Sequence, residues 1–288
     1  MSFKLIALCL LLITRTITIN ALSNPSGARL FGNISFLLGL SGGINFSTPT
    51  VINSYSLFSN ISTTTSPVTK TYAKWFRNTG SQFGIIAMAQ ISDKTYITLQ
   101  PSVTTHNYKY TGSYTWLNPK DVSQTSQLTY KHVNSLKYFE IPLLMRRDLT
   151  NSKLTPYIQA GAFYSMLQSG MQNVDLTEAI GSSQQINQIP EGSMSGSVTS
   201  QYLASHLGII GGGGIAYKLE YVMLGLDLQY KRGLNNITNK ANRFSNQSLL
   251  GDTFDVPDDI GLHAWMISIN VIFNLGLNKP AKSALKCP

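Results

Sequence analysis

The sequence predicts an all-β protein, a closed eight-stranded antiparallel up-and-down transmembrane β-barrel with long extracellular loops and short periplasmic turns. Three observations lead to this fold class. Apolar side chains alternate with polar or small ones through eight segments, as in strands that have one apolar face. Long and short connections between the segments alternate strictly, which places all long connections at one end. Aromatic residues gather near the segment ends, where membrane-spanning strands meet lipid headgroups.

The last apolar run, residues 263–277, shows the alternation most clearly. Its apolar face carries Trp265, Ile267, Ile269, Val271, Phe273 and Leu275. Its other face carries Met266, Ser268, Asn270, Ile272 and Asn274. Such a strand fits either a soluble sandwich or a membrane barrel with a narrow lumen. The sorting of the loops favours the barrel, because Greek-key crossings would mix long and short connections.

Seven further segments are expected to form the other strands of the barrel. They cover about residues 30–46, 82–91, 95–104, 136–148, 155–168, 202–219 and 222–231. The long loops are expected at 47–79, 111–133, 169–200 and 234–262, and the tight turns near 92–94, 150–153 and 220. Pro101 should interrupt the hydrogen-bond ladder of its strand. The glycine run at 211–214 indicates strong bending or close packing, as small barrels need.

The ends of the chain are expected to lie outside the barrel. Residues 1–23 read as a cleaved signal peptide, with Lys4 before the apolar run 5–13 and cleavage before Asn24. That run is too short to span a bilayer as a helix. The barrel should cover residues 24–277, and residues 278–288 should form a periplasmic C-terminal tail.

Composition excludes several classes of function. The 288 residues carry a net charge of +9, but the basic residues are scattered singly, which argues against nucleic-acid binding. After cleavage Cys287 is the remaining cysteine, so no internal disulfide and no thiolate metal site is expected. No cofactor motif is present, and we expect neither a cofactor nor a bound metal.

Charged side chains inside the expected barrel should be paired. Eight strands leave a lumen that side chains fill, and an isolated charge there is costly. By strand parity Glu140, Arg146, Asp227 and Lys231 face inward. We expect Glu140 to lie nearer Lys231 and Arg146 nearer Asp227, forming a structural network that makes the barrel rigid. The alternative role for these four residues is an ion path.

Aromatic side chains on the outward face should form two girdles at the membrane interfaces. The outer girdle is expected to contain Phe46, Phe83, Tyr230 and Trp265, and the inner one Tyr217 and Phe273.

Histidines supply the alternatives to a purely structural barrel. His106, His132, His206 and His263 all map to the outer halves of strands or to their loop junctions. A shared metal site or a pH-responsive rim is conceivable, but the sequence lacks a ligand spacing such as HxxxH. A hydrolase at the outer rim would have to use His206 with Ser205 or Ser165, or His263 with Asp259, and spacing does not rank these pairs. We expect no catalytic site.

Four pieces of the chain resemble successive hairpins of a known family. ISDKTYITLQPSV, KYFEIPLLMRRDL, LTPYIQAGAFYSML and YKRGLNNI follow one another between about Phe83 and Leu277. They are similar to the PorT-like outer-membrane β-barrel family of Bacteroidetes. This resemblance implies an eight-stranded barrel in the outer membrane of a Gram-negative bacterium. It also implies a link to protein secretion of the type IX kind, with other outer-membrane or periplasmic secretion proteins as partners.

Three classes of function remain open from the sequence. The favoured one is a non-enzymatic accessory or structural barrel whose external loops contact partners, with membrane lipid or lipopolysaccharide around it. The second is a small passive or ligand-gated pore. The third is a hydrolase at the barrel rim.

Overall fold

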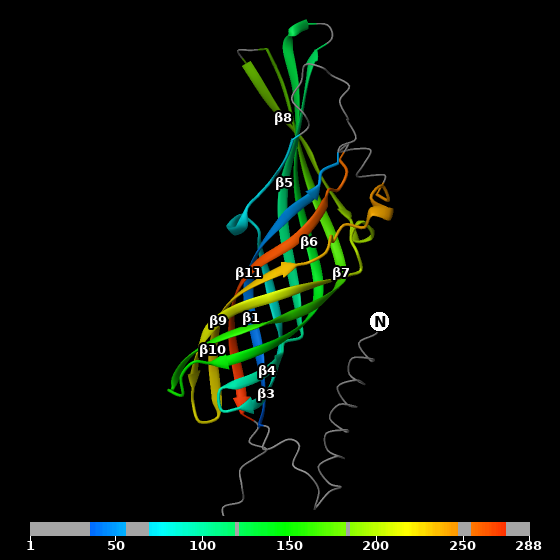
Figure 1. Ribbon diagram of the computed structural model, residues 1–288. Helices are drawn as coiled ribbons and strands as arrows, with labels where there is room; N and C mark the ends of the chain where they lie inside the picture. Colours follow the sequence, from blue (N-terminus) through cyan, green and yellow to red (C-terminus); the bar gives the residue numbers. More distant parts are fainter. Residues whose placement is uncertain (1–34, 56–68, 119–120, 183–184, 247–254, 275–288) are drawn as a thin grey trace, which may run out of the picture. The chain divides into compact units, whose positions relative to one another are not determined.

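The computed structural model describes residues 35–55, 69–118, 121–182, 185–246 and 255–274. Within these residues the chain forms eleven β-strands and three short 3-10 helices (Figure 1). The elements are β1 (Ser35–Asn53), β2 (Thr69–Tyr72), η1 (Trp75–Arg77), β3 (Thr79–Ser92), β4 (Thr95–Leu99), β5 (Ser102–Asn118), β6 (Asp121–Asp148), β7 (Leu154–Ser182), β8 (Gln185–Ser197), η2 (Thr199–Gln201), β9 (Ser205–Lys218), β10 (Val222–Gly233), η3 (Lys240–Asn242) and β11 (Asp259–Asn274). No helix in these ranges is long and apolar enough to cross a membrane.

The sheet closes into a ring of eight staves, where a stave is one strand or, in one case, two consecutive strands that occupy one position in the ring. Each stave pairs with the next in the order β1, β3, β4 with β5, β6, β7, β9, β10 and β11, and β11 pairs back with β1. All these pairings are antiparallel, as predicted. β4 and β5 form one stave that is interrupted at Gln100 and Pro101, because proline cannot donate to the ladder. β2 and β8 are additional strands that pair with β5 and β7.

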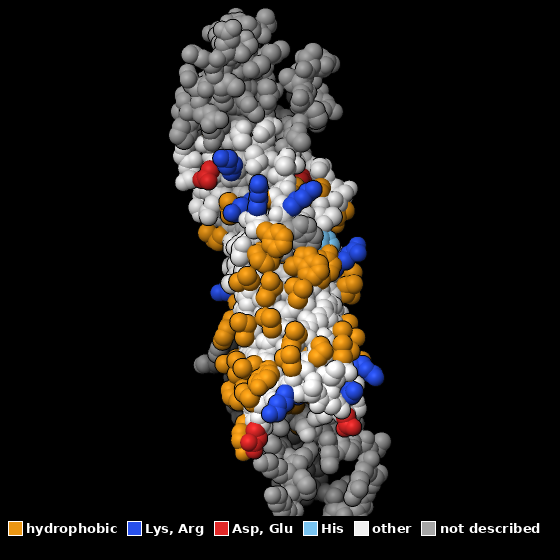
Figure 2. Space-filling view, turned by 90° about the vertical axis from the view of Figure 1, so that its left-hand side faces the viewer, with side chains coloured by type: hydrophobic (Ala, Val, Ile, Leu, Met, Phe, Trp, Pro, Cys, Tyr) orange, Lys and Arg blue, Asp and Glu red, His pale blue; other side chains and the backbone are white. Residues whose placement is uncertain are grey.

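The two faces of the strands separate as the alternation predicts. On β11, Trp265, Ile267, Ile269 and Phe273 are exposed, whereas Met266 and Ile272 are buried. Most outward positions at the same level of the other strands are also apolar and exposed, among them Ile85, Ile209 and Leu226. Figure 2 shows the result as a band of hydrophobic side chains, with lysines and arginines at its upper and lower limits. We call this zone the apolar band.

The long connections contain far more strand than the sequence predicted. β5 and β6 continue to Asn118 and from Asp121, so most of the expected loop 111–133 is a hairpin. The expected loop 169–200 is likewise formed mainly by the end of β7, β8 and η2, and β1 continues to Asn53. The prediction was wrong here because it relied on apolar alternation. Above the apolar band the outward face of a strand meets water, while the inward face carries tyrosines beside polar groups such as His132 and Asn134, so the apolar alternation disappears.

Buried side chains occupy the lumen. At the outer end lies an apolar cluster that includes five tyrosines: Tyr108, Tyr110, Tyr130, Tyr138 and Tyr202. At the inner end, Ile86, Met88 and Tyr157 belong to a second cluster. Leu144, Phe163 and Ile210 form a third.

Several predictions fall on residues outside the described ranges. These are the signal peptide 1–23, the first residues of the first strand, the end of the last strand at Leu277, and the tail with Cys287. They stay predictions.

Candidate functional site

Glu140 on β6 is the centre of a polar layer in the lumen. Its carboxylate forms an ion pair with Lys231 of β10, across the lumen. It also contacts His106 Nε2 at 3.1 Å and accepts hydrogen bonds from Thr104 Oγ1 at 3.0 Å and Ser165 Oγ at 3.2 Å. All five residues are buried. The structure therefore brings Glu140 and Lys231 together and surrounds the pair with hydrogen-bonding groups, which a buried ion pair requires.

In the same layer a serine contacts a histidine, and that histidine contacts a carboxylate. Ser47 Oγ lies 2.8 Å from Nδ1 of His106, whose other ring nitrogen contacts Glu140. This order of groups is used by serine hydrolases to activate the hydroxyl. Here, however, Ser47 has no exposed surface, so a substrate has no access to its hydroxyl. In addition, Glu140 already forms an ion pair with Lys231. The chain of contacts ties β1, β5, β6 and β10 together.

Sequence reasoning missed this arrangement for a simple reason. The first strand was expected to end at Phe46, which placed Ser47 in a loop. An inward parity for Ser47, in phase with Asn45, was the available signal.

Arg146 and Asp227 do not pair as expected. Arg146 Nε lies 3.0 Å from Asp148 Oδ1, two residues away on the same face of β6. Tyr157 lies between the expected partners: its ring is under the Arg146 guanidinium at 3.5 Å, and its hydroxyl donates to Asp227. Asn270 Nδ2 also donates to Asp227 at 2.8 Å. The prediction was wrong because Asp148 was treated as the end of the strand, although it is the nearest carboxylate of the same parity.

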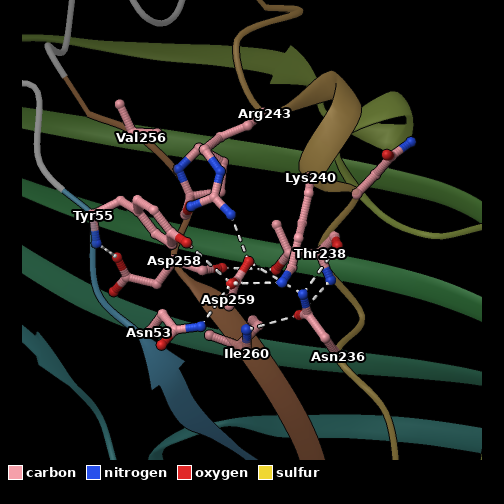
Figure 3. Close-up of polar contacts among 12 residues, drawn as sticks. Asn53, Tyr55, Asn236, Thr238, Lys240, Arg243, Val256, Asp258, Asp259 and Ile260 are labelled. Atoms are coloured by element: carbon pink, nitrogen blue, oxygen red, sulfur yellow. Dashed lines mark hydrogen bonds and ion pairs between the residues drawn. The ribbon is translucent and has the colours of Figure 1, made fainter.

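A second polar cluster lies at the outer mouth of the barrel, where the chain enters β11 (Figure 3). Asp258 accepts hydrogen bonds from the Tyr55 backbone N–H at 2.8 Å and from the Tyr72 hydroxyl at 2.7 Å. Lys70 Nζ lies 3.1 Å from the same carboxylate. Thr238 Oγ1 donates to the Asp258 carbonyl at 2.7 Å. These contacts hold residues 255–260 against β2 and the end of β1.

Asp259 is the second anchor of the mouth. Asn53 and Asn236 donate to its carboxylate at 3.0 and 3.1 Å, and Arg243 does so at 2.5 Å. Lys240 lies 3.4 Å away. Burial alone would raise the pKa of Asp259, but the hydrogen bonds from Asn53 and Arg243 and the charges of Arg243 and Lys240 outweigh burial and hold it below its usual range.

The third carboxylate of the mouth connects it to the aromatic cluster in the lumen. Asp255 accepts a hydrogen bond from the Tyr110 hydroxyl at 2.6 Å and pairs with Lys70 at 2.8 Å. The His132 ring stacks on Tyr110, with 4.3 Å between ring centroids. Burial lowers the pKa of His132 to about 4, so the ring is neutral at pH 7.

These features together describe a membrane barrel whose lumen is filled with side chains and whose outer mouth is held together by hydrogen bonds and ion pairs. The sequence model of the outer membrane protein beta-barrel domain matches residues 23–239. The chain belongs to this family. The barrel therefore lies in the outer membrane of a Gram-negative bacterium.

Solved structures of outer-membrane barrels are similar to this barrel at low identity. Neisserial surface protein A is 11% identical, with a TM-score of 0.34 and coverage of 85% of this chain and 100% of its own. OprG from Pseudomonas aeruginosa is 15% identical, with a TM-score of 0.36 and coverage of 84% and 97%. Ail of Yersinia pestis is 12% identical, with a TM-score of 0.30 and coverage of 83% and 99%. The comparison with curated proteins found no match.

The predicted girdle residues all lie on the outward face of this outer-membrane barrel. Phe46, Trp265 and Tyr230 are direct neighbours across β1, β11 and β10. Phe83 pairs with Gly42, outside that row. Tyr217 and Phe273 are exposed, on β9 and β11 respectively.

The four histidines of the barrel lie in different surroundings. His206 packs edge-on against Tyr138 at 4.9 Å, while Ser165 donates to Glu140 and not to His206. His263 lies beside Tyr230, and its expected partner Asp259 is bound by Arg243. Across the described ranges, no group of three or more His, Cys, Asp or Glu residues could hold a metal ion.

Proposed function

We propose that this protein is a non-conducting, non-enzymatic outer-membrane barrel that presents an extracellular β-sheet to partner proteins. The observation that carries the proposal is the continuation of β5, β6, β7 and β8 past the apolar band as a paired sheet. We call this part the outer sheet; it includes about residues 111–130 and 171–197. Strands that only had to cross the membrane would not need this extra length.

The occupied lumen supports the non-conducting part of the proposal. An ion would have to pass the tyrosine cluster at the outer end and the Glu140–Lys231 pair below it. Both are held by packing and by hydrogen bonds. The pore interpretation of the inward charges is therefore the weaker one.

Conductance separates the two interpretations. The purified full chain, inserted into a planar bilayer, should give no steady single-channel steps at voltages where an outer-membrane porin conducts. Steady steps of one size, obtained with several preparations, would contradict the proposal.

Site-specific photo-crosslinking in intact cells tests the partner-binding part. A photoreactive residue at exposed positions of the outer sheet, such as Met171, Asn173 and Ser193, should form discrete adducts with another polypeptide. The same residue at Ile269, in the apolar band, is the matched control and should give none. Absence of adducts from every outer-sheet position would contradict a role in protein contact.

The identity of the partner can be narrowed by the resemblance to PorT-like barrels of Bacteroidetes. The pieces ISDKTYITLQPSV, KYFEIPLLMRRDL, LTPYIQAGAFYSML and YKRGLNNI support the finer proposal that the partner belongs to a protein-secretion machinery of the type IX kind. Deletion of the gene should then reduce the amount of secreted protein. Unchanged secretion would exclude this version and leave the broader proposal standing.

A further inference from the structure

The outward face of β1, β11 and β10 changes character over three successive rows of paired residues. The first row, Ile44, Ile267 and Leu228, is aliphatic and exposed. The next row toward the outer end is Phe46, Trp265 and Tyr230, and the row beyond it is Thr48, His263 and Arg232. Aliphatic, then aromatic, then polar and basic is the order expected across a lipid–water interface.

A short segment of the first long connection extends this interface sideways. η1 projects from the side of the barrel (Figure 1), and the ring of its Phe76 lies 5.1 Å from that of Phe46, edge to face. Phe76 is 79% exposed, which is a large unfavourable exposure in water. In the headgroup region of a membrane the same ring would be buried.

The segment is held firmly in this position. Asn78, which is fully buried, donates from Nδ2 to the carbonyls of Ser47 at 3.0 Å and Ala73 at 2.8 Å. The Ser47 N–H donates in turn to the Asn78 carbonyl at 3.0 Å. Phe76 and its neighbour Arg77 are therefore presented by a built turn.

Positive charge lies on the outer side of the aromatic row. Arg77 follows Phe76, and Arg232 is two residues beyond Tyr230 on the same face; both are exposed. Two strand spacings, about 10 Å, separate Phe46 from Tyr230. The nearest carboxylate of this parity on β11, Asp259, is buried and bound by Arg243, so it does not neutralise the patch.

We propose that this outer rim patch, formed by Phe46, Phe76, Arg77, Tyr230, Arg232 and Trp265, binds the phosphorylated sugar headgroup of a glycolipid in the outer leaflet. Guanidinium groups form charge-assisted, often bidentate hydrogen bonds with phosphate oxygens. The aromatic rings pack against the sugar and the first carbons of the acyl chains, as amphipathic rings do at headgroup level. The lumen plays no part in this binding.

Native mass spectrometry of the full chain in detergent, with added lipid A, tests the proposal. The variant Arg77→Ser/Arg232→Ser should lose about twenty-fivefold in lipid A binding, because each of the two basic residues at an anionic surface contributes a factor of about five. The matched control is Arg147→Ser/Lys153→Ser, which removes the same charge from exposed positions near the inner end and should bind within about twofold of the original. Lipid A stripped of its phosphates should bind the unchanged protein as weakly as intact lipid A binds the outer variant.

Three results would overturn the proposal. They are equal losses in the outer and inner variants, equal binding of lipid A with and without phosphates, and unchanged binding by the outer variant. Correct insertion is checked by the heat-dependent shift of the folded band on a gel. If the double variant does not insert, Phe76→Ser provides the second test, and it should weaken lipid A binding without removing charge.

Discussion

The part of the barrel inside the apolar band and the part above it share the same strands but are held together differently. Inside the band, one face of each strand meets lipid, and the lumen holds an ion pair and hydrogen bonds among buried groups such as Glu140 and Lys231. Above the band, tyrosines fill the interior and aspartates tie the mouth. The difference shows that lipid, and not the strand itself, imposes the alternating pattern.

The two parts should also respond differently to substitution. In the band, water cannot reach a group that loses its partner, and a change should affect the whole barrel. At the mouth and in the outer sheet, water can replace a lost partner, so effects should be smaller and local. Four predictions follow this order.

The largest effect is expected for Glu140→Gln. It leaves the Lys231 ammonium buried without a counter-charge, which should cost about 3–5 kcal/mol of unfolding free energy. Urea unfolding of the protein in lipid vesicles, followed by tryptophan fluorescence, measures the loss.

The matched double variant is Glu140→Gln/Lys231→Met. It should recover a large part of the loss, because no unpaired charge remains. A single variant as stable as the original protein would mean that water reaches Lys231, and the proposed contrast between the two parts would fail.

The apolar band could be predicted from the sequence, whereas the outer sheet could not. On β11, apolar residues such as Trp265, Ile267 and Ile269 recur at every second position, because the side chains that face lipid must be apolar. Residues 111–118 and 171–182 do not face lipid, so their sequence does not have to alternate and does not distinguish a strand from a loop. Hydrogen-bonded pairing with neighbouring strands, which the sequence does not display, makes them strands.

The lumen site was predictable in composition but less so in its pairs. Strand parity alone predicts that four charged residues face inward, namely Glu140, Arg146, Asp227 and Lys231. Which charges meet depends on the stagger of the strands and on what lies between them. Tyr157, whose role had no signal in the alternation, separates Arg146 from Asp227.

The second prediction concerns the glycine run of β9. A Cβ on Gly212 would lie 2.2 Å from the Leu228 carbonyl oxygen of β10, whereas one on Gly211 would meet no atom closer than 4.0 Å. Gly212→Ala should therefore destabilise the barrel by about 1–3 kcal/mol, and Gly211→Ala by less than about 0.5 kcal/mol. The same urea titration compares them. Equal effects would show that the close approach of β9 and β10 relaxes without cost.

Acidification should act at the mouth. His132 has a pKa of about 4 in the folded protein and an ordinary pKa near 6.5 when unfolded. The unfolded state therefore binds the proton first, and stability should fall by about 1–2 kcal/mol between pH 6.5 and 5. The lowered pKa of Asp259 acts in the same direction at still lower pH, below its ordinary value. His132→Gln removes the first component. Hydrogen exchange of residues 255–260 at pH 7 and pH 5, with and without that substitution, measures it; identical pH dependence in both proteins would contradict the assignment.

The smallest effect is expected in the outer sheet. Gly192 in β8 has φ of +66°, beside a register shift in the pairing with β7. A side chain in this left-handed region costs about 1 kcal/mol. Because β8 pairs with β7 above the apolar band, Gly192→Ala should loosen the β7–β8 hairpin and leave unfolding of the barrel unchanged. Limited proteolysis should cut the variant faster near residue 192, while the urea midpoint stays the same. A shift of that midpoint would mean that the outer sheet and the membrane-spanning ring unfold as one cooperative unit, since strain in β8 would then be felt by every strand of the ring.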